Sequence, residues 1–68
     1  MALNYAYHYA LIDETGYCYE VCDSSYNYNG YDGYIAIPSY NFDYLEKYYI
    51  NGAWYEDAEA TIPWSPEN

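Results

Sequence analysis

The stretch 5–23 constrains the fold most, because two runs of β type flank a turn sequence in it. The turn is Asp13-Glu14-Thr15-Gly16, which suits a type I turn followed by a glycine in the left-handed region. Glycine enters that region without the steric penalty that a Cβ atom brings. The sequence therefore predicts a β-hairpin with strands 5–13 and 17–23.

This turn sets a register between the two strands. Outward from the turn, the expected pairs are Asp13–Tyr17, Ile12–Cys18, Leu11–Tyr19, Ala10–Glu20, Tyr9–Val21 and His8–Cys22. Side chains alternate between the faces of a sheet, so each strand contributes every second residue to a face. A slip of one residue would exchange the faces, and we expect burial to hold the register.

The two faces differ in bulk. The bulky face is Tyr5, Tyr7, Tyr9, Leu11, Tyr17, Tyr19 and Val21. The opposite face is Ala6, His8, Ala10, Ile12, Cys18, Glu20 and Cys22. Because the first face is aromatic and nearly uncharged, we expect it to lie in the core or against a partner.

The middle of the chain reads as a loop, a strand and a helical turn. Residues 24–33 contain Asn-Gly and Asp-Gly turn dipeptides and predict a loop. Residues 34–38 alternate in a strand pattern that a proline ends. Residues 39–47 predict one helical turn, which either Asn41 or Asp43 caps. In it, Phe42 and Leu45 are expected to face one core.

A second hairpin spans 48–56, because Asn51-Gly52 is a strong signal for a type I′ turn. Its expected pairs are Tyr49–Trp54, Tyr48–Tyr55 and Lys47–Glu56. The first two pairs are aromatic and stabilise the hairpin by cross-strand contact. The third is an exposed ion pair, which contributes little to stability.

The last segment, 58–68, predicts an extended tail, since Pro63 and Pro66 forbid helix. The tail either frays or docks Trp64 on its own domain or on a neighbour. The whole chain is thus expected to be mainly β. It is a small antiparallel meander of two hairpins plus a middle strand, with one short helical turn and an extended C-terminal tail after a single domain at 1–57.

Size and charge limit what such a domain can do. A chain of 68 residues buries only about 60% of the surface that its unfolded form exposes, which is less than a larger domain buries. Association with another chain would therefore help to stabilise it. Fourteen tyrosines supply most of the large side chains. The formal net charge is −10 and Lys47 is the one lysine or arginine. Nucleic acids and anionic membranes bind cationic proteins, so we exclude both as partners.

The cysteines indicate no internal disulfide. Cys18 and Cys22 would lie roughly 13 Å apart on a strand, beyond the reach of a disulfide bond. They are expected to be reduced or paired between chains. The sequence starts without the basic and apolar regions of a signal peptide, and no run is long enough to span a membrane. We therefore expect synthesis in a cytoplasm, without insertion into a membrane.

Neither a metal site nor an enzyme is predicted. His8 and Cys22 face each other in the expected register, but Cys18 lies too far along the strand to complete a zinc site. The same pair lacks the orienting group and cleft that a nucleophile needs. The acidic residues lack the spacing of a calcium loop. We expect no cofactor and no catalytic residues.

The loop 24–34 is the best candidate for binding. Its tyrosines alternate with Asn, Ser and Gly, a composition typical of binding loops, where tyrosine offers rigid contact area. Two interpretations stay open: the loop packs on its own sheet, or it forms a contact surface for proteins or sugars. The expected interface residues are Tyr5, Tyr7, Tyr9, Tyr19, Tyr26, Tyr28, Tyr31, Tyr34, Trp54 and Trp64.

Four segments carry a resemblance to a known group. They are Tyr9-Ala10-Leu11-Ile12-Asp13-Glu14-Thr15-Gly16-Tyr17-Cys18, Ile35-Ala36-Ile37-Pro38-Ser39-Tyr40, Asp43-Tyr44-Leu45-Glu46-Lys47-Tyr48-Tyr49 and Asn51-Gly52-Ala53-Trp54-Tyr55. Over residues 9–57 the chain resembles small structural proteins of tailed phages, including segments of tail-fibre-like proteins. It departs from their pattern at Glu46, where a glycine is expected, and in its greater tyrosine content.

The resemblance implies a structural role in a virion or tail and no enzymatic activity. The leading hypothesis is a structural or adaptor protein of a phage-like particle, in which tyrosine-rich surfaces bind copies of this chain, as an oligomer or fibre, and other virion proteins. The alternative is a recognition module, diversified or engineered, that binds a protein or a surface glycan through the loop 24–34.

Overall fold

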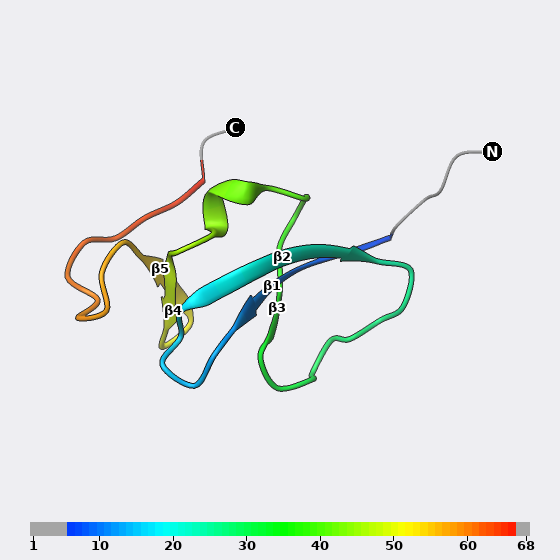
Figure 1. The fold of residues 1–68 in the computed structure, drawn as a ribbon, viewed down its shortest axis with the longest axis horizontal. Coiled ribbons are helices and arrows are strands. Elements are labelled where there is room, and N and C mark those ends of the chain that lie inside the picture. The colour runs from blue at the N-terminus through cyan, green and yellow to red at the C-terminus, as the bar shows by residue number, and fades with distance from the viewer. Residues whose placement is uncertain (1–5, 67–68) are drawn as a thin grey trace.

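The computed structural model describes residues 6–66 and is mainly β (Figure 1). Its elements are β1 (Tyr7–Ile12), β2 (Cys18–Ser24), β3 (Tyr34–Ala36), the 3₁₀ turn η1 (Phe42–Tyr44), β4 (Tyr48–Ile50) and β5 (Ala53–Tyr55). All strand pairs are antiparallel. The mainly β, antiparallel fold class expected from the sequence is therefore confirmed, and each element lies within the segment that predicted it, apart from a one-residue extension of β2 to Ser24. The strand order is not that of a meander, because β3 pairs with β1 and not with β2.

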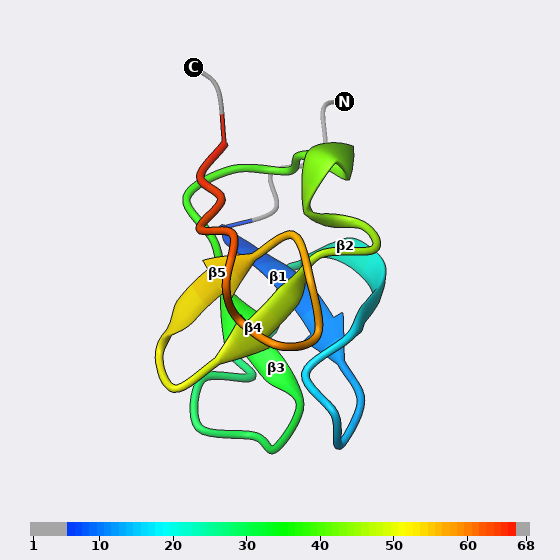
Figure 2. The ribbon, with the colours of Figure 1, turned by 90° about the vertical axis from the view of Figure 1, so that its left-hand side faces the viewer.

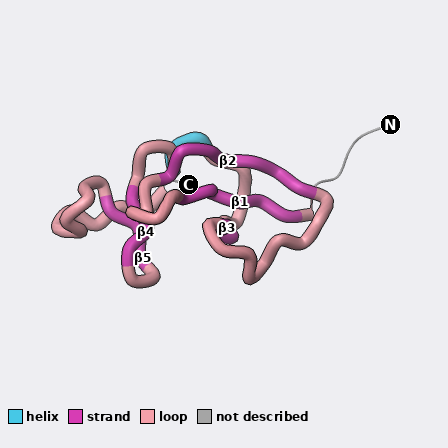
Figure 3. Tube along the Cα trace, turned by 60° about the horizontal axis from the view of Figure 1, so that its bottom comes forward, coloured by secondary structure: helices cyan, strands magenta, loops and turns pink. Residues whose placement is uncertain are grey.

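The first three strands form one sheet in the order β2-β1-β3, so β1 lies in the centre. The chain leaves the far end of β2 and returns along the sheet before it enters β3 (Figure 3). β3 then pairs with β1, with Tyr9 opposite Ala36 and Leu11 opposite Tyr34. Because β1 is paired on both edges, its side chains are the best placed to be covered on both faces.

The pairing of β1 with β2 contains a β-bulge, which corrects the expected register. Ile12 pairs with Cys18 as expected, but Leu11 pairs with Glu20, which leaves Tyr19 as the extra residue. Beyond the bulge every expected pair is wrong by one position, so that Ala10 lies opposite Val21. The bulge brings Val21 to the same face as Ala10, while the Tyr19 side chain is 55% exposed.

The main hydrophobic core cluster lies on the face with the smaller side chains. On the bulky face Tyr9 is buried at 1% exposure, and contact of the rest of that face with a partner stays a prediction. The buried residues of the main cluster are Ala10, Cys18, Val21, Ile37 and Tyr44. Small side chains on the sheet let other elements approach closely, and the aromatic bulk comes from η1 and the second hairpin. Trp54 and Trp64 pack against this core.

The helical turn is confirmed, and Asn41 is its cap: the Asn41 side chain accepts a hydrogen bond from the Asp43 amide at 2.8 Å. The expectation that Phe42 faces the core was wrong, since Phe42 is 61% exposed. The turn ends at Tyr44, so the spacing argument that joined Phe42 to Leu45 does not apply. Tyr44 is the residue that the turn delivers to the core.

The second hairpin has the predicted register, with Tyr49 opposite Trp54 and Tyr48 opposite Tyr55. The turn residues Asn51 and Gly52 have φ angles of 52° and 84°. Positive values at both positions are the requirement of a type I′ turn, which explains why Asn-Gly predicted this element correctly.

Backbone hydrogen bonds join the two sheets where the first hairpin meets β4. The Cys18 amide donates to the Lys47 carbonyl at 2.8 Å, and the Tyr49 amide donates to the Gly16 carbonyl at 2.8 Å. The β4–β5 hairpin consequently lies across the end of the three-stranded sheet (Figure 2). At this junction Glu46 has a φ of 68°, in the region that favours glycine.

The described part of the tail docks on its own chain. The Trp64 amide donates to the Trp54 carbonyl at 3.0 Å, and the Lys47 Nζ lies 5.0 Å from the centre of the Trp64 ring. The expected Lys47–Glu56 ion pair does not form, since within residues 6–66 the one contact at ion-pair distance joins the side chains of His8 and Asp23. Trp64 therefore helps to close the core of its own domain.

Candidate functional site

Tyr9 anchors the loop between β2 and β3 to the sheet. Its ring is 1% exposed, and its hydroxyl group accepts a hydrogen bond from the Tyr28 amide at 2.8 Å. The same hydroxyl donates to the Asn29 side chain at 3.0 Å. A central strand residue thus fixes the middle of the loop through two hydrogen bonds, so the loop has a defined shape on the sheet.

Six tyrosines pack on this face of the sheet and form what we call the tyrosine cluster: Tyr7, Tyr9, Tyr26, Tyr28, Tyr31 and Tyr34. Tyr28 and Tyr34 stack with their ring centres 4.7 Å apart at an angle of 20°. Tyr31 meets the Tyr28 ring edge-on at 5.3 Å. Such offset and edge-on pairs are favourable arrangements, so the rings hold one another in place.

The cluster is buried at its base and open at its top. Tyr9 is covered, Tyr28 and Tyr34 are half-buried, and Tyr26 and Tyr31 are 59% and 52% exposed. The exposed rings are held by neighbours that are themselves fixed to the sheet. The cluster therefore presents aromatic area that needs little ordering when a partner binds.

The loop backbone is held by short-range turn contacts. The Tyr31 amide donates to the Tyr28 carbonyl at 3.0 Å, and the Tyr34 amide donates to the Tyr31 carbonyl at 3.1 Å. Gly30 and Gly33 supply the positive φ angles that these turns need. The loop that the sequence predicted is thus two successive turns, and tyrosines stand at both ends of each hydrogen bond.

One carboxylate, that of Glu20, lies among the groups that affect the ionisation of Tyr34. Burial raises the pKa of Tyr34, and negative charge on its neighbours, Glu20 among them, raises that pKa further. Glu20 is exposed on β2, opposite Leu11, and Leu11 lies opposite Tyr34 on the other side. The phenol rings thus share their face of the sheet with a carboxylate.

The structure brings only part of the expected interface together. Six of the ten residues form the tyrosine cluster, and Tyr19 is exposed at the bulge. Trp54 and Trp64 lie elsewhere: their rings contact Tyr44 at centre distances of 4.9 Å and 5.1 Å, within the core. Tyr5 lies outside the described residues. Asn29, which sequence reasoning did not single out, joins the site because Tyr9 binds its side chain.

The expected contact between His8 and Cys22 was wrong. The bulge places His8 opposite Asp23, and the His8 Nδ1 lies 2.6 Å from the Asp23 carboxylate. Cys22 lies opposite Tyr9, on the face away from the core. Cys18 and Cys22 are both free thiols, and burial raises the pKa of each.

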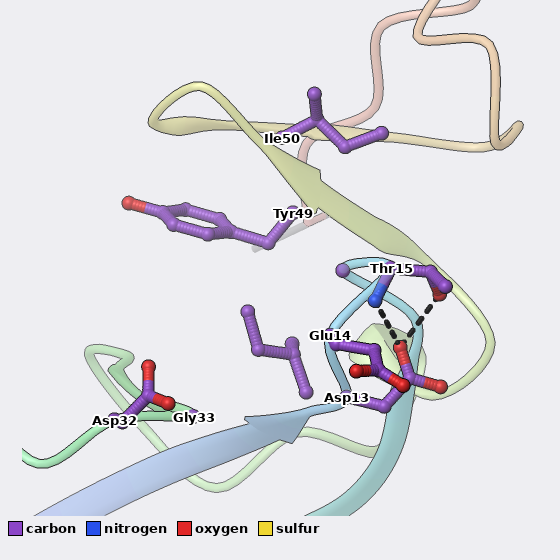
Figure 4. A pocket seen from close by; sticks show the side chains of 9 residues that line it. Asp13, Glu14, Thr15, Asp32, Gly33, Tyr49 and Ile50 are labelled. Atoms are coloured by element: carbon purple, nitrogen blue, oxygen red, sulfur yellow. Dashed lines mark hydrogen bonds between the residues drawn. The ribbon is translucent and has the colours of Figure 1, made fainter.

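A hollow of about 430 Å³ lies between the first hairpin turn, the 32–33 turn and β4. Its main lining residues are Ile12, Asp13, Glu14, Asp32, Tyr49 and Ile50. Glu14 and Asp32 come from opposite sides of the hollow, with the Tyr49 ring beside them (Figure 4). Carboxylates and apolar side chains therefore line this hollow together. Sequence reasoning missed this hollow, because it depends on the docking of two hairpins.

No group of three or more His, Cys, Asp and Glu side chains within residues 6–66 is arranged to hold a metal ion. None of the helices in that range has the length and apolar character needed to cross a membrane.

Comparison with known proteins gave no match to this chain among family models, curated proteins or solved structures.

Proposed function

We propose that this protein is a non-enzymatic structural or adaptor protein that acts through its tyrosine cluster, in a particle of the phage-like kind. The observation that carries the proposal is the exposure of Tyr26 and Tyr31 above a base of packed tyrosines. A domain that needed these rings only for stability would cover them, as it covers Tyr9 and Tyr44. Rigid aromatic residues with open faces are enriched at protein interfaces.

The partners under this proposal are copies of the same chain and other proteins of the particle. Aromatic surfaces on such a small domain favour association, since its own core buries little area. The placement in a phage-like particle rests on the resemblance of four turn and strand segments, and the contact surface rests on the packing of the cluster.

Sedimentation of the full chain, from micromolar to millimolar concentration and with a mixture of candidate partners, tests this proposal. We expect association that the double substitution Tyr26→Ser and Tyr31→Ser removes, because both rings contribute exposed contact area. A matched control is Tyr40→Ser, since Tyr40 is also exposed, at 43%, but lies outside the cluster. A chain that stays monomeric and binds none of the partners would overturn the proposal.

A second candidate function is a recognition module for proteins or glycans. The observation that favours it is the loop composition, in which Asn27 and Asn29 stand between the tyrosines. The Asn29 amide is already held by Tyr9, so it is oriented before any ligand binds. Screening against a glycan array, with Tyr28→Ala as the loss-of-binding variant, separates this function from assembly.

A further inference from the structure

The hollow between the first hairpin turn, the 32–33 turn and β4 contains two carboxylates that the protein does not use. The Asp13 side chain is already hydrogen-bonded within the first hairpin turn, because it accepts hydrogen bonds from the Thr15 amide at 2.8 Å and the Tyr17 amide at 3.1 Å. Glu14 and Asp32 are exposed, and neither side chain makes a hydrogen bond or ion pair within residues 6–66. The hollow thus offers negative charge from two separate turns.

The hollow also has apolar side chains beside polar ones such as Thr15. Ile12 and Ile50 belong to different sheets and both line it, together with the Tyr49 ring. An occupant that satisfies both parts needs an apolar stem and a cationic head. Lysine and arginine side chains have this construction, and they bury the stem while the head stays near water and anions.

The chain itself cannot supply such a residue. Its one basic side chain apart from histidine is Lys47, which lies over the Trp64 ring. A second copy would also bring another formal charge of −10 to the surface. At the hollow itself, Glu14 and Asp32 repel the negative groups of a second copy, whereas a basic segment is attracted and steered. Charge complementarity therefore selects a different, basic protein as the occupant.

The position of the hollow connects it with the tyrosine cluster. Asp32 and Gly33 line the hollow, and the residues on either side of this pair, Tyr31 and Tyr34, belong to the cluster. Their ring centres are 6.1 Å apart. A peptide that lies on these rings can therefore continue past the 32–33 turn, where one of its side chains can enter the hollow.

We infer that the hollow between the first hairpin turn and the 32–33 turn receives a lysine or arginine side chain from a basic segment of a different protein, which lies across Tyr31 and Tyr34. This inference rests on the proposed function, since it names the chemistry of a partner for the same surface. It assigns the contact area to the tyrosines and the choice of partner to the carboxylates.

The test uses the full chain and a nine-residue peptide with three arginines separated by glycine, serine and tyrosine. The control peptide replaces each arginine by citrulline, which has nearly the same shape and no charge. Binding is measured by calorimetry and by NMR at about 50 mM salt, where charge pairs are weakly screened. We expect the citrulline peptide to bind at least ten-fold more weakly, and the arginine peptide to shift the resonances of Glu14 and Asp32.

Two double variants distinguish binding of the peptide at the hollow from attraction by the net negative charge of the protein. Glu14→Gln with Asp32→Asn should weaken binding of the arginine peptide at least five-fold. Glu56→Gln with Glu59→Gln makes the same change in net charge at two other exposed positions and should change binding less than two-fold. Thermal unfolding of each variant checks that the fold is retained, and the citrulline comparison needs no variant at all.

Other results would overturn the inference. If both peptides bound equally and Tyr26→Ser with Tyr31→Ser abolished that binding, the peptides would contact the tyrosines, but the hollow would not recognise a basic side chain. If the two double variants lost equal affinity for the arginine peptide, the overall negative charge of the protein, and not the hollow, would explain the binding. No binding of either peptide at millimolar concentration would also overturn it, whereas the proposed function is decided separately by sedimentation with its own partners.

Discussion

The two faces of the three-stranded sheet handle aromatic side chains in opposite ways. On the core face, small residues such as Ala10 and Val21 lie on the sheet, and Tyr44 and Trp64 cover them from other elements. On the other face, Tyr9 lies on the sheet, and the rings that cover it remain half-buried or exposed. Stability is thus concentrated on the first face, and the second keeps surface for contacts.

The comparison predicts a large difference between truncations of single tyrosines. Tyr44→Ala should lower the free energy of unfolding by about 3–5 kcal/mol, as removal of a buried ring leaves a cavity. Tyr31→Ala should lower it by less than about 1 kcal/mol, because half of that ring is already in water. Urea unfolding followed by circular dichroism measures both. Equal losses would mean that the tyrosine cluster is a second core.

A glycine substitution tests the junction that closes the core face. A Cβ atom on Gly16 would lie 2.5 Å from the Tyr49 carbonyl oxygen, at a φ of 91°. Gly16→Ala should therefore cost about 2–4 kcal/mol, from the strained backbone and the clash together. The control is Gly30→Ala in the tyrosine loop, where φ is 89° and no atom lies within 4 Å of the added Cβ. It carries only the backbone penalty, about 1–2 kcal/mol. Urea midpoints that coincide would contradict the docking of the hairpin turn.

The open face has one polar anchor, which Tyr9→Phe removes. The substitution keeps the ring and leaves the Tyr28 amide without its acceptor. A lost hydrogen bond of this type costs about 1–2 kcal/mol. We expect faster hydrogen exchange at the amides of the loop 25–33, with unchanged exchange at β4. Uniform acceleration throughout the chain would show that the loop and the core unfold as one unit.

The smallest effect concerns pH. Hydrogen bonds from Thr15, above all from its hydroxyl group, lower the pKa of Asp13 from its ordinary value of 3.8. A lowered pKa means that the charged form stabilises the fold above pH 3.8, and that this contribution is lost as the pH falls through the lowered value. The Asp13 carboxyl resonance should titrate with a midpoint below 3.8, and the stability gap to Asp13→Asn should shrink in that range. A midpoint at or above 3.8 would contradict the turn geometry.

Sequence reasoning predicted the elements well where the signal is local. Asn51-Gly52 and the turn at Gly16 both require positive φ angles, and the residues at those positions permit them. Asn41 likewise caps the helical turn through a contact only two residues away. Turn chemistry of this kind can be derived from the sequence because the contacts involved span a few residues.

The core and the site depend on distant contacts, which the sequence does not display. One bulge at Tyr19 moved Val21 to the core face, and no residue nearby marks that position. The choice of core face depended on Tyr44 and Trp64, which lie far along the chain. The hollow around Glu14 and Asp32 requires two turns to meet. The tyrosines of the loop were predicted as a candidate site from composition, but their mutual packing was not.

The bulge has a chemical consequence for the two thiols. Cys18 keeps its expected pairing with Ile12 and lies in the core, where its exposed fraction is 0%, whereas the bulge turns Cys22 toward the side of Tyr9. An alkylating reagent should therefore modify Cys22 in the native protein and reach Cys18 only when the interior opens. The ratio of the two modification rates would report how often the core of this domain opens, without any introduced label.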